Sequence, residues 1–169
     1  MNIRRKSAHD DEWLRDVLVR DWGGTSIVVH GDEIDLSAFA GLIAGERDGI
    51  AIFREEDPAE LLLLSAFTKG AGVGSALVEA VIAALLERGA RSLRVTTTND
   101  NLDALRFYQR RGFRLVELRP GAVNAARRRK PSIPELGDHG IPLTDELDLV
   151  LDLDNEGTLV HHMHENRFR

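Results

Sequence analysis

Three glycines between residues 69 and 75 could bind an anionic ligand. The segment reads Lys69-Gly-Ala-Gly-Val-Gly-Ser75 and stands between a short apolar run and a long helical pattern. Glycine lets backbone N–H groups approach a ligand closely, and a helix start adds unpaired N–H donors with about half a positive charge. The segment therefore suits a phosphate or pyrophosphate group, with Lys69 as an additional cation.

Three classes of ligand could use such a loop. A magnesium-nucleotide loop needs Gly-x-x-x-x-Gly-Lys-Ser/Thr, but Gly74-Ser75 lacks that lysine. A dinucleotide loop needs Gly-x-Gly-x-x-Gly at the first strand–helix turn, and this loop differs in both spacing and place. A pyrophosphate-bearing cofactor such as coenzyme A is the third class. A glycine-rich turn that binds nothing stays open as the alternative.

A second polar pattern lies on the helix predicted for residues 101–111. Asn101, Ala104, Leu105 and Tyr108 are spaced so that they share one helix face. Asn101 and Tyr108 are polar groups on an otherwise apolar stripe, where they could serve a reaction. A core tyrosine whose hydroxyl bonds to the backbone would give the same pattern.

Strand and helix patterns alternate around these two segments. The helix over 72–88 has apolar residues on one stripe and ends at Gly89, and Asp100 is expected to cap the helix over 101–111. Residues 25–35 are ambiguous, and 120–142 are predicted to be mostly loop with one helical turn at 122–129. A further helix is expected between Asp11 and Gly23, and strands are expected at 1–7, 41–46, 49–54, 61–67, 92–98, 113–118 and 145–154. This order predicts an α/β (α+β) protein with a mixed sheet.

The strand predicted at 145–154 alternates leucine with mostly acidic residues. Leucines occupy the odd positions from 147 to 153, while Asp148 and Asp152 lie on the other face. This alternation predicts a half-buried strand.

Composition bounds the class of protein. The chain has 169 residues, 43% hydrophobic residues, a net charge of −6 and no cysteine, which excludes disulfides, thiolate metal sites and cysteine nucleophiles. No apolar run approaches the roughly 18 residues of a membrane span, and no apolar segment follows the basic N-terminus as in a secretory signal. We expect one cytoplasmic domain over 1–154 and a polar tail over 155–169. The acidic charge argues against nucleic-acid binding, and the run His161-His162-Met163-His164 is expected to be solvated rather than to bind a metal.

Residues 61–118 resemble the GNAT (GCN5-related N-acetyltransferase) superfamily. The family's phosphate loop reads Gln/Arg-x-x-Gly-x-Gly/Ala, and its next helix reads Asn-x-x-Ala-x-x-x-Tyr-x-x-x-Gly-Phe. The chain has Lys69-Gly70-Ala71-Gly72-Val73-Gly74 and then Asn101, Ala104, Tyr108, Gly112 and Phe113 at the matching spacing. Two departures stand out. Lys69 replaces the usual planar side chain, and only Thr68 separates it from the end of the buried strand at Phe67.

The resemblance implies a mostly antiparallel sheet flanked by helices, with acetyl-CoA between the strands at 61–67 and 92–98 and no metal. Asn101 would contact the cofactor or a nearby water, Ala104 would leave room for the pantetheine arm, and Tyr108 would point at the thioester sulfur. Because a thiol has a pKa of about 8.5 and tyrosine about 10, Tyr108 would mainly donate a hydrogen bond to the departing thiolate. The implied cofactor-binding residues are Ala66, Phe67, Thr68, Lys69, Gly70, Ala71, Gly72, Val73, Gly74, Ser75, Asn101 and Ala104.

The implied reaction is direct attack of a primary amine on acetyl-CoA, with a small molecule or a peptide as acceptor. A base must neutralise the amine, and the motif does not name it; Glu55, Glu56, Glu60, His139 and Glu146 are candidates. The loop 120–142 and Trp22 are expected to wall the acceptor pocket. The basic run Arg127–Lys130 is either a solvated turn or a contact for an anion. The alternative function is a non-catalytic acyl-CoA-binding sensor or regulatory module, and the sequence does not distinguish a monomer from a homodimer.

Overall fold

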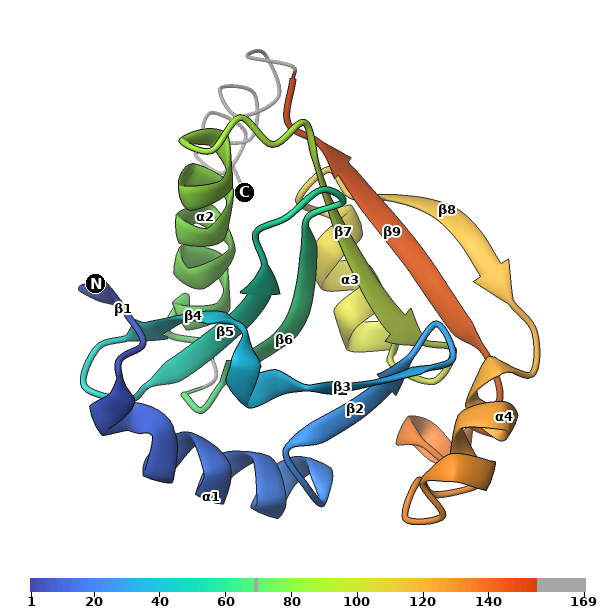
Figure 1. Ribbon diagram of the computed structural model, residues 1–169. Coiled ribbons are helices and arrows are strands. Elements are labelled where there is room, and N and C mark those ends of the chain that lie inside the picture. Colours follow the sequence, from blue (N-terminus) through green and yellow to red (C-terminus); the bar gives the residue numbers. More distant parts are fainter. Residues whose placement is uncertain (69, 155–169) are drawn as a thin grey trace.

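A seven-stranded sheet forms the centre of the computed structural model, which describes residues 1–68 and 70–154 (Figure 1). Only β6 and β7 are parallel; every other neighbouring pair in this sheet is antiparallel. In spatial order the strands are β1 (Ile3–Arg5), β4 (Ala40–Ala44), β5 (Gly49–Arg54), β6 (Glu60–Ala66), β7 (Ser92–Thr98), β9 (Glu146–Asp152) and β8 (Arg114–Arg119). The mixed, mostly antiparallel sheet confirms the predicted fold class.

Helices cover both faces of this sheet. On one face, α1 (Asp11–Trp22) packs Leu14 and Leu18 against Ile43 and Ile50. On the other face, α2 (Val73–Leu86) packs against β4 and β5 at residues such as Ala51, and α3 (Leu102–Gln109), which lies against β8, adds Tyr108 to the same apolar cluster. Because strand side chains alternate between faces, the two apolar clusters lie on opposite sides of the sheet.

The parallel strands β6 and β7 separate soon after they meet. They pair only at Glu60 with Arg94 and at Leu61 with Val95, near the start of β6. Beyond these two pairs the strands diverge toward Ala66 and Thr98, and α3 is seen behind the gap between them (Figure 1). The sheet is therefore split along its middle on the side where β6 and β7 end.

A small hairpin lies in front of the main sheet. It consists of β2 (Ser26–Val29) and β3 (Asp32–Asp35), with His30 and Gly31 in its turn at φ of 52° and 82°. The ambiguous residues 25–35 thus form a two-residue β-turn hairpin of the kind that needs positive φ. Figure 1 shows the hairpin running from the end of α1 across to β9, close to α4 (Ala122–Arg129).

Helices α3 (Leu102–Gln109) and α4 (Ala122–Arg129) differ from their predictions in different ways. The helix predicted over 101–111 spans only Leu102–Gln109, and Asn101 rather than Asp100 is its N-cap. Asp100 instead accepts hydrogen bonds from the Thr98 hydroxyl at 2.5 Å and from the Asp138 N–H at 2.8 Å. The helical turn expected at 122–129 is a complete short helix, α4.

The strand at the end of the described chain also departs from expectation. Leu149, Leu151 and Leu153 pack in the core below α2 and α3, as the alternation predicts. Asp148 lies on the other face, yet it is fully buried. The hairpin and Arg119 cover this face, so β9 is buried on both sides at Asp148.

The longest helix in residues 1–68 and 70–154 is α2, whose 14 residues fall short of the roughly 20 that cross a bilayer. The predicted tail over 155–169, including His161–His164, lies outside the described residues.

Candidate active site

The glycine loop meets the start of α2 at the open end of the β6–β7 divergence. Gly70 and Gly72 have φ of 78° and 74°, a conformation that favours glycine. Gly72 is the N-cap of α2, and its carbonyl accepts the Ala76 N–H at 3.0 Å. Apart from the chain neighbours, no atom of the described residues lies within 4 Å of where a Cβ would stand at either glycine. The loop is therefore open to a ligand, as the sequence predicts for a phosphate site.

The loop residues differ in how accessible they are. Ala66, Phe67, Thr68, Gly70 and Ala71 are exposed, whereas Val73 is buried in the core. Lys69 lies outside the described residues. The Phe67 N–H already donates to the Asp48 carbonyl at 2.9 Å, so a pantetheine contact at Phe67 would use its carbonyl rather than its N–H.

Helix α3 packs directly against the first turn of α2. A Cβ on Gly74 would lie 3.4 Å from the Phe107 ring, at the edge of ordinary van der Waals contact, so the two helices touch at this glycine. The guanidinium of Arg111 stacks 3.5 Å from the centre of the same ring and donates a hydrogen bond to the Ser75 hydroxyl. Gly74 and Ser75 therefore have packing roles that the sequence motif did not indicate.

The predicted polar residues of α3 sit at its two ends. Asn101 accepts the Ala104 N–H through Oδ1 at 3.0 Å, which caps the helix. Tyr108 is only 6% exposed and lies edge-on to Phe107 and Phe113, with ring centres 5.2 and 5.3 Å away. Burial raises the pKa of Tyr108 well above its usual range. The hydroxyl consequently stays protonated and is a hydrogen-bond donor rather than a ready proton source.

A cluster of polar side chains occupies the opposite face of the sheet, beneath the hairpin. Arg119 binds Asp148 with two hydrogen bonds of 2.7 Å and also binds Glu146. The Thr96 hydroxyl donates to Asp148 at 2.7 Å. Glu60, Asp148 and Glu146 are all buried. We call Glu60, Thr96, Arg119, Glu146, Asp148 and His30 the polar cluster.

The charge of Asp148 is set by two opposing effects. Burial raises its pKa, but hydrogen bonds from Arg119, Thr96 and His30 together lower it well below the usual range. Asp148 is therefore an anion at neutral pH and can only accept hydrogen bonds. The hydrogen bonds of Arg119 to Asp148 and Glu146 raise the pKa of Arg119 above its already high value.

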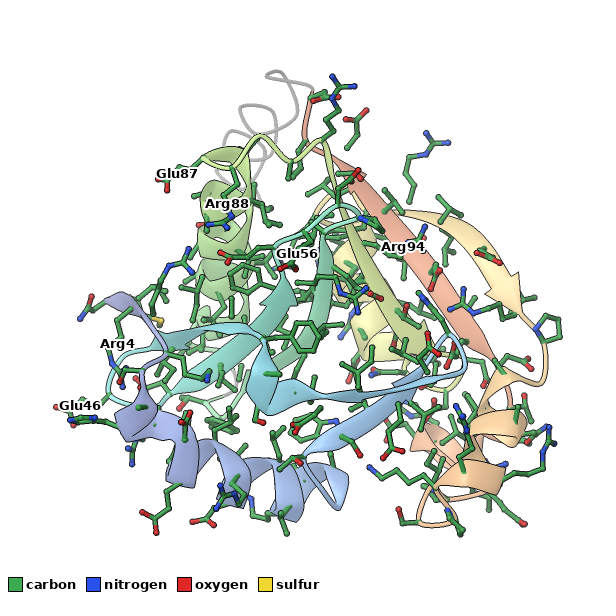
Figure 2. All side chains as sticks on the ribbon, in the orientation of Figure 1. Arg4, Glu46, Glu56, Glu87, Arg88 and Arg94 are labelled. Atoms are coloured by element: carbon green, nitrogen blue, oxygen red, sulfur yellow. The ribbon has the colours of Figure 1, made fainter. Side chains whose placement is uncertain are left out.

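Of the five candidate bases, the structure places only Glu60 and Glu146 in the polar cluster. Glu55 forms ion pairs with Arg5 at 3.0 Å and Arg88 at 3.8 Å. Glu56 is exposed on the loop that joins β5 to β6, away from the open end of the divergence (Figure 2). His139 is exposed on a short 3-10 helix (Asp138–Gly140).

His30, like Thr96, Arg119 and Asp148, is a cluster residue that the sequence did not single out as a site candidate. It lies at the hairpin turn, and its Nε2 is 2.9 Å from the Thr96 hydroxyl and 3.2 Å from Asp148. No local sequence pattern predicts a functional role for His30, because its partners are 66 and 118 residues away. The dipeptide His30-Gly31 between apolar and acidic residues is the only signal, and it indicates a turn rather than a site.

Two adjoining cavities open beside the polar cluster. The first has a volume of about 420 Å³ and is lined by Trp22, Ile27, Thr98, Val123 and Pro134 among others. The second, of about 490 Å³, is lined by His30, Arg119 and Arg128. Glu146 lines both cavities. Trp22 and the 120–142 segment thus face one cavity, and that this cavity receives the acceptor stays a prediction.

The basic run Arg127–Lys130 holds this region together. Arg127 donates to the carbonyls of Ile133, Pro134 and Leu143 at 3.0, 2.7 and 2.7 Å. Lys130 donates to the carbonyls of Trp22 and Ser26, both at 2.9 Å. These two cations therefore bind backbone, and the expectation that the run is either a solvated turn or an anion contact is wrong for them.

Across residues 1–68 and 70–154, no group of three or more His, Asp or Glu side chains could hold a metal ion.

Comparison with known proteins identifies the family. The family model described as "Acetyltransferase (GNAT) family" matches residues 4–113. Two proteins of Bacillus subtilis (strain 168) are similar in sequence: the uncharacterized protein YxbD, 37% identical over 142 residues, and the uncharacterized protein YdhI, 32% identical over 141. Each alignment covers 79% of this chain and 87% of the relative. The chain belongs to the GNAT acetyltransferase family, which confirms the predicted reaction class.

Solved structures share the fold at low sequence identity. An IAA acetyltransferase from Bacillus cereus ATCC 14579 superposes with a TM-score of 0.66 at 19% identity, covering 89% of this chain and 98% of that one. A GNAT family acetyltransferase from Elizabethkingia anophelis with acetyl-CoA bound gives 0.61 at 20% identity, covering 89% and 97%. A Bacillus subtilis acetyltransferase in complex with CoA gives 0.63 at 19% identity, also covering 89% and 97%. The fold is thus one that holds the predicted cofactor in other proteins.

Proposed function

We propose that the protein transfers an acetyl group from acetyl-CoA to a primary amine of a small molecule or peptide, by direct attack of the amine on the thioester. One observation carries this proposal. The parallel strands β6 and β7 pair at only two positions and then diverge, and the divergence opens beside the N-terminus of α2. Solved relatives of this fold hold acetyl-CoA or CoA.

The cofactor would lie along the divergence with its phosphates at the glycine loop. Unpaired N–H groups at residues 70–75 suit the pyrophosphate, and Lys69 would add its charge. The pantetheine arm would run past Ala66, the Phe67 carbonyl and Thr68, where the chain is exposed. Ala104 would leave space for the arm, and Asn101, already engaged as the α3 cap, would contact the cofactor through its amide NH₂.

Tyr108 would assist the departing thiolate. Its pKa is raised by burial, so complete proton transfer to a thiolate is even less favourable than for an ordinary tyrosine. A hydrogen bond from the hydroxyl to the developing negative charge on sulfur does not require that transfer. We therefore assign Tyr108 the role of a donor that stabilises charge.

The acceptor would enter on the face that carries the hairpin. The cavity of about 420 Å³ is lined mainly by apolar side chains, including Trp22, Ile27 and Val123. Such a lining suits an amine attached to an apolar body. Thr98, at the end of β7, also lines this cavity. The cavity therefore lies beside the open end of the strand divergence.

Two assays test the proposal. The first compares thermal unfolding with acetyl-CoA, CoA and ATP, because a ligand at about 100 times its Kd stabilises the folded state by roughly 2.7 kcal/mol. The second follows release of the CoA thiol with a thiol reagent over a panel of amines. Since the chain contains no cysteine, the reagent detects CoA alone.

Each outcome has a distinct meaning. Stabilisation by both CoA species and not by ATP, followed by amine-dependent thiol release, is the expected result. Stabilisation without release for any amine would favour the alternative of a non-catalytic acyl-CoA sensor. No stabilisation by millimolar acetyl-CoA would contradict both functions.

A further inference from the structure

His30 is held in place over the sheet by both its backbone and its ring. Its N–H donates to Glu146 at 3.4 Å, and Arg129 of α4 donates to the carbonyl of the next residue, Gly31. The ring reaches Thr96 and Asp148, and 28% of the side chain remains exposed. His30 also lines the cavity of about 490 Å³. The ring is thus anchored on one side and accessible on the other.

The ring stands where the strands begin to separate. Val95 belongs to the last β6–β7 pair, and Thr96 is the next residue of β7. Thr96 pairs with Asp148 across β7 and β9, on the face away from α2 and α3. Tyr108 is buried in the cluster on the other face. His30 and Tyr108 therefore lie on opposite sides of the divergence that would hold the thioester.

The neighbours of Nε2 determine which ring nitrogen carries the proton. Asp148 is an anion and accepts hydrogen bonds only. The Thr96 hydroxyl donates its hydrogen to Asp148 at 2.7 Å, so toward His30 it can only accept. Both groups near Nε2 therefore present acceptors, so Nε2 carries the hydrogen. Nδ1 is left with its lone pair and makes no hydrogen bond to any residue in the described ranges. A carboxylate that orients a histidine in this way leaves the other nitrogen free to accept a proton.

We propose that His30 is the general base that deprotonates the acceptor amine, with Asp148 and Thr96 as its positioning residues. This inference rests on the proposed acetyl transfer. The acceptor arrives as an ammonium ion, and Nδ1 of His30 takes one proton. The neutral nitrogen attacks the thioester carbon to form a C–N bond, and the C–S bond breaks with its electron pair on sulfur. The nitrogen loses a second proton, which the thiolate takes up, and His30 returns its proton to solvent.

The charges around the ring suit a histidine that gains and loses a proton. Glu60 of β6 lies 3.9 Å from Nε2, and Arg54 of β5 lies 3.9 Å from the same carboxylate. Arg94 of β7 is 3.8 Å from Asp148 (Figure 2 labels Arg94). The remaining charged groups are Glu146 and Asp148 of β9, Arg119 of β8 and Arg129 of α4. The arginines balance the charge of the carboxylates around the ring.

The test compares His30→Gln with His139→Gln. Both histidines have positive φ, 52° and 58°, so the two substitutions carry a similar backbone cost, while only His30 lies in the polar cluster. Glutamine at 30 can still hydrogen-bond to Asp148 but cannot hold a proton. We expect kcat/KM at pH 7 to fall about 10²-fold or more for His30→Gln and to stay unchanged for His139→Gln. Stabilisation by acetyl-CoA should be the same in all three proteins.

The pH profile and the ring tautomer separate catalysis from a structural effect. Wild-type kcat/KM should rise with pH through the range in which imidazole loses its proton, and His30→Gln should lack this rise. Independently of turnover, ¹⁵N NMR of the His30 ring should show hydrogen on Nε2. An active His30→Gln enzyme with the same rise, or hydrogen on Nδ1, would overturn the inference. A wild-type protein that binds acetyl-CoA but releases no thiol with any amine would overturn the proposed function itself.

Discussion

The cofactor side and the acceptor side of the molecule are held together in different ways. On the cofactor side, Gly72 bonds to Ala76 and Asn101 to Ala104, contacts that span four and three residues. On the acceptor side, the characteristic contacts join residues far apart in sequence. His30 meets Asp148 across 118 residues, Lys130 meets Trp22 across 108, and Arg129 meets Gly31 across 98.

This difference follows from what each side must recognise. The phosphates of a cofactor are bound by backbone N–H groups, which a short glycine segment and one helix start can supply. An acceptor pocket is defined by side chains on several elements, and their identity can vary while the fold is kept. The cofactor side can therefore be read as a motif, whereas the acceptor side exists only once the chain has folded.

On the acceptor side, the largest loss of stability should come from removing Arg119. Arg119→Met leaves the buried carboxylates of Asp148 and Glu146 without their cation. Removing one partner of a buried ion pair typically costs about 3–5 kcal/mol of unfolding free energy. Chemical denaturation measures this loss, and Arg114→Met, an exposed arginine on the same strand, should lose almost nothing.

The same variant should show a pH dependence with a defined sign. Although burial opposes it, hydrogen bonding keeps the pKa of Asp148 below its usual value. The carboxylate therefore adds stability above a pH of about 4 and loses it as the pH falls through the lowered pKa. Arg119→Met removes this contribution, so its deficit against wild type should be full at pH 7 and should shrink as the pH falls below about 4. A deficit that does not change with pH would show that Arg119 acts through packing alone.

On the cofactor side, the largest loss of kcat should come from removing the Tyr108 hydroxyl. Tyr108→Phe should lower kcat by on the order of 10²-fold, the usual effect of removing one donor to a developing anion. Stabilisation by acetyl-CoA should persist, because the ring still fills its place between Phe107 and Phe113. An unchanged kcat with a saturating acceptor would remove this role.

The raised pKa of Tyr108 can be checked directly. It is the only tyrosine in the chain, so tyrosinate absorbance in a pH titration reports on this residue alone. Because burial disfavours the phenolate, the signal should be absent from the folded protein well above pH 10 and appear on unfolding.

Local patterns predicted most of the fold and the cofactor side. The strand at 92–98 has the predicted bounds, and the αL glycine at 23 ends α1 where expected. The start of α3 was less predictable, because both Asp100 and Asn101 are good caps, and Asp100 instead accepts hydrogen bonds from the Thr98 hydroxyl and the distant Asp138 N–H.

The acceptor side could not be predicted because its residues look ordinary one at a time. An aspartate on a strand with alternating leucines normally faces water, and nothing near Asp148 in sequence reveals that Arg119 and the hairpin bury it. His30 likewise stands in a turn whose sequence predicts only the turn. Glu146 was a candidate base, but its bonds to Arg119 make it a structural partner.

Substituting the two tryptophans one at a time should affect the KM of only one substrate each, and so distinguish the acceptor side from the cofactor side. Trp22 lines the cavity of about 420 Å³, while Trp13 packs edge-on to Phe67 at the end of β6, with ring centres 6.2 Å apart. Trp22→Ala should raise KM for the amine roughly tenfold through lost apolar contact and leave KM for acetyl-CoA unchanged. Trp13→Ala should do the reverse. Equal effects of both variants on both constants would mean that the two sides are not independent.

Two helix-capping glycines provide the finest comparison. Gly72 caps α2 with φ 74° and Gly121 caps α4 with φ 73°. In both cases nothing in the described part of the chain, apart from the chain neighbours, lies within 4 Å of where a Cβ would stand. Alanine at either position must adopt a left-handed conformation, so each substitution should cost about 1 kcal/mol of unfolding free energy. The two variants should therefore be equally destabilised.

Their kinetics should nevertheless differ. Gly72→Ala shifts N–H groups that would face the pyrophosphate, and weakening one hydrogen bond to a charged group by about 1.4 kcal/mol corresponds to a tenfold higher KM for acetyl-CoA. At Gly121 the N–H donates to Asp145 at 2.8 Å, so Gly121→Ala should leave that KM unchanged. Steady-state kinetics beside matched denaturation curves measure both quantities. A rise in KM for both variants, in step with their loss of stability, would mean that the glycine loop contributes to the cofactor site only through the stability of α2.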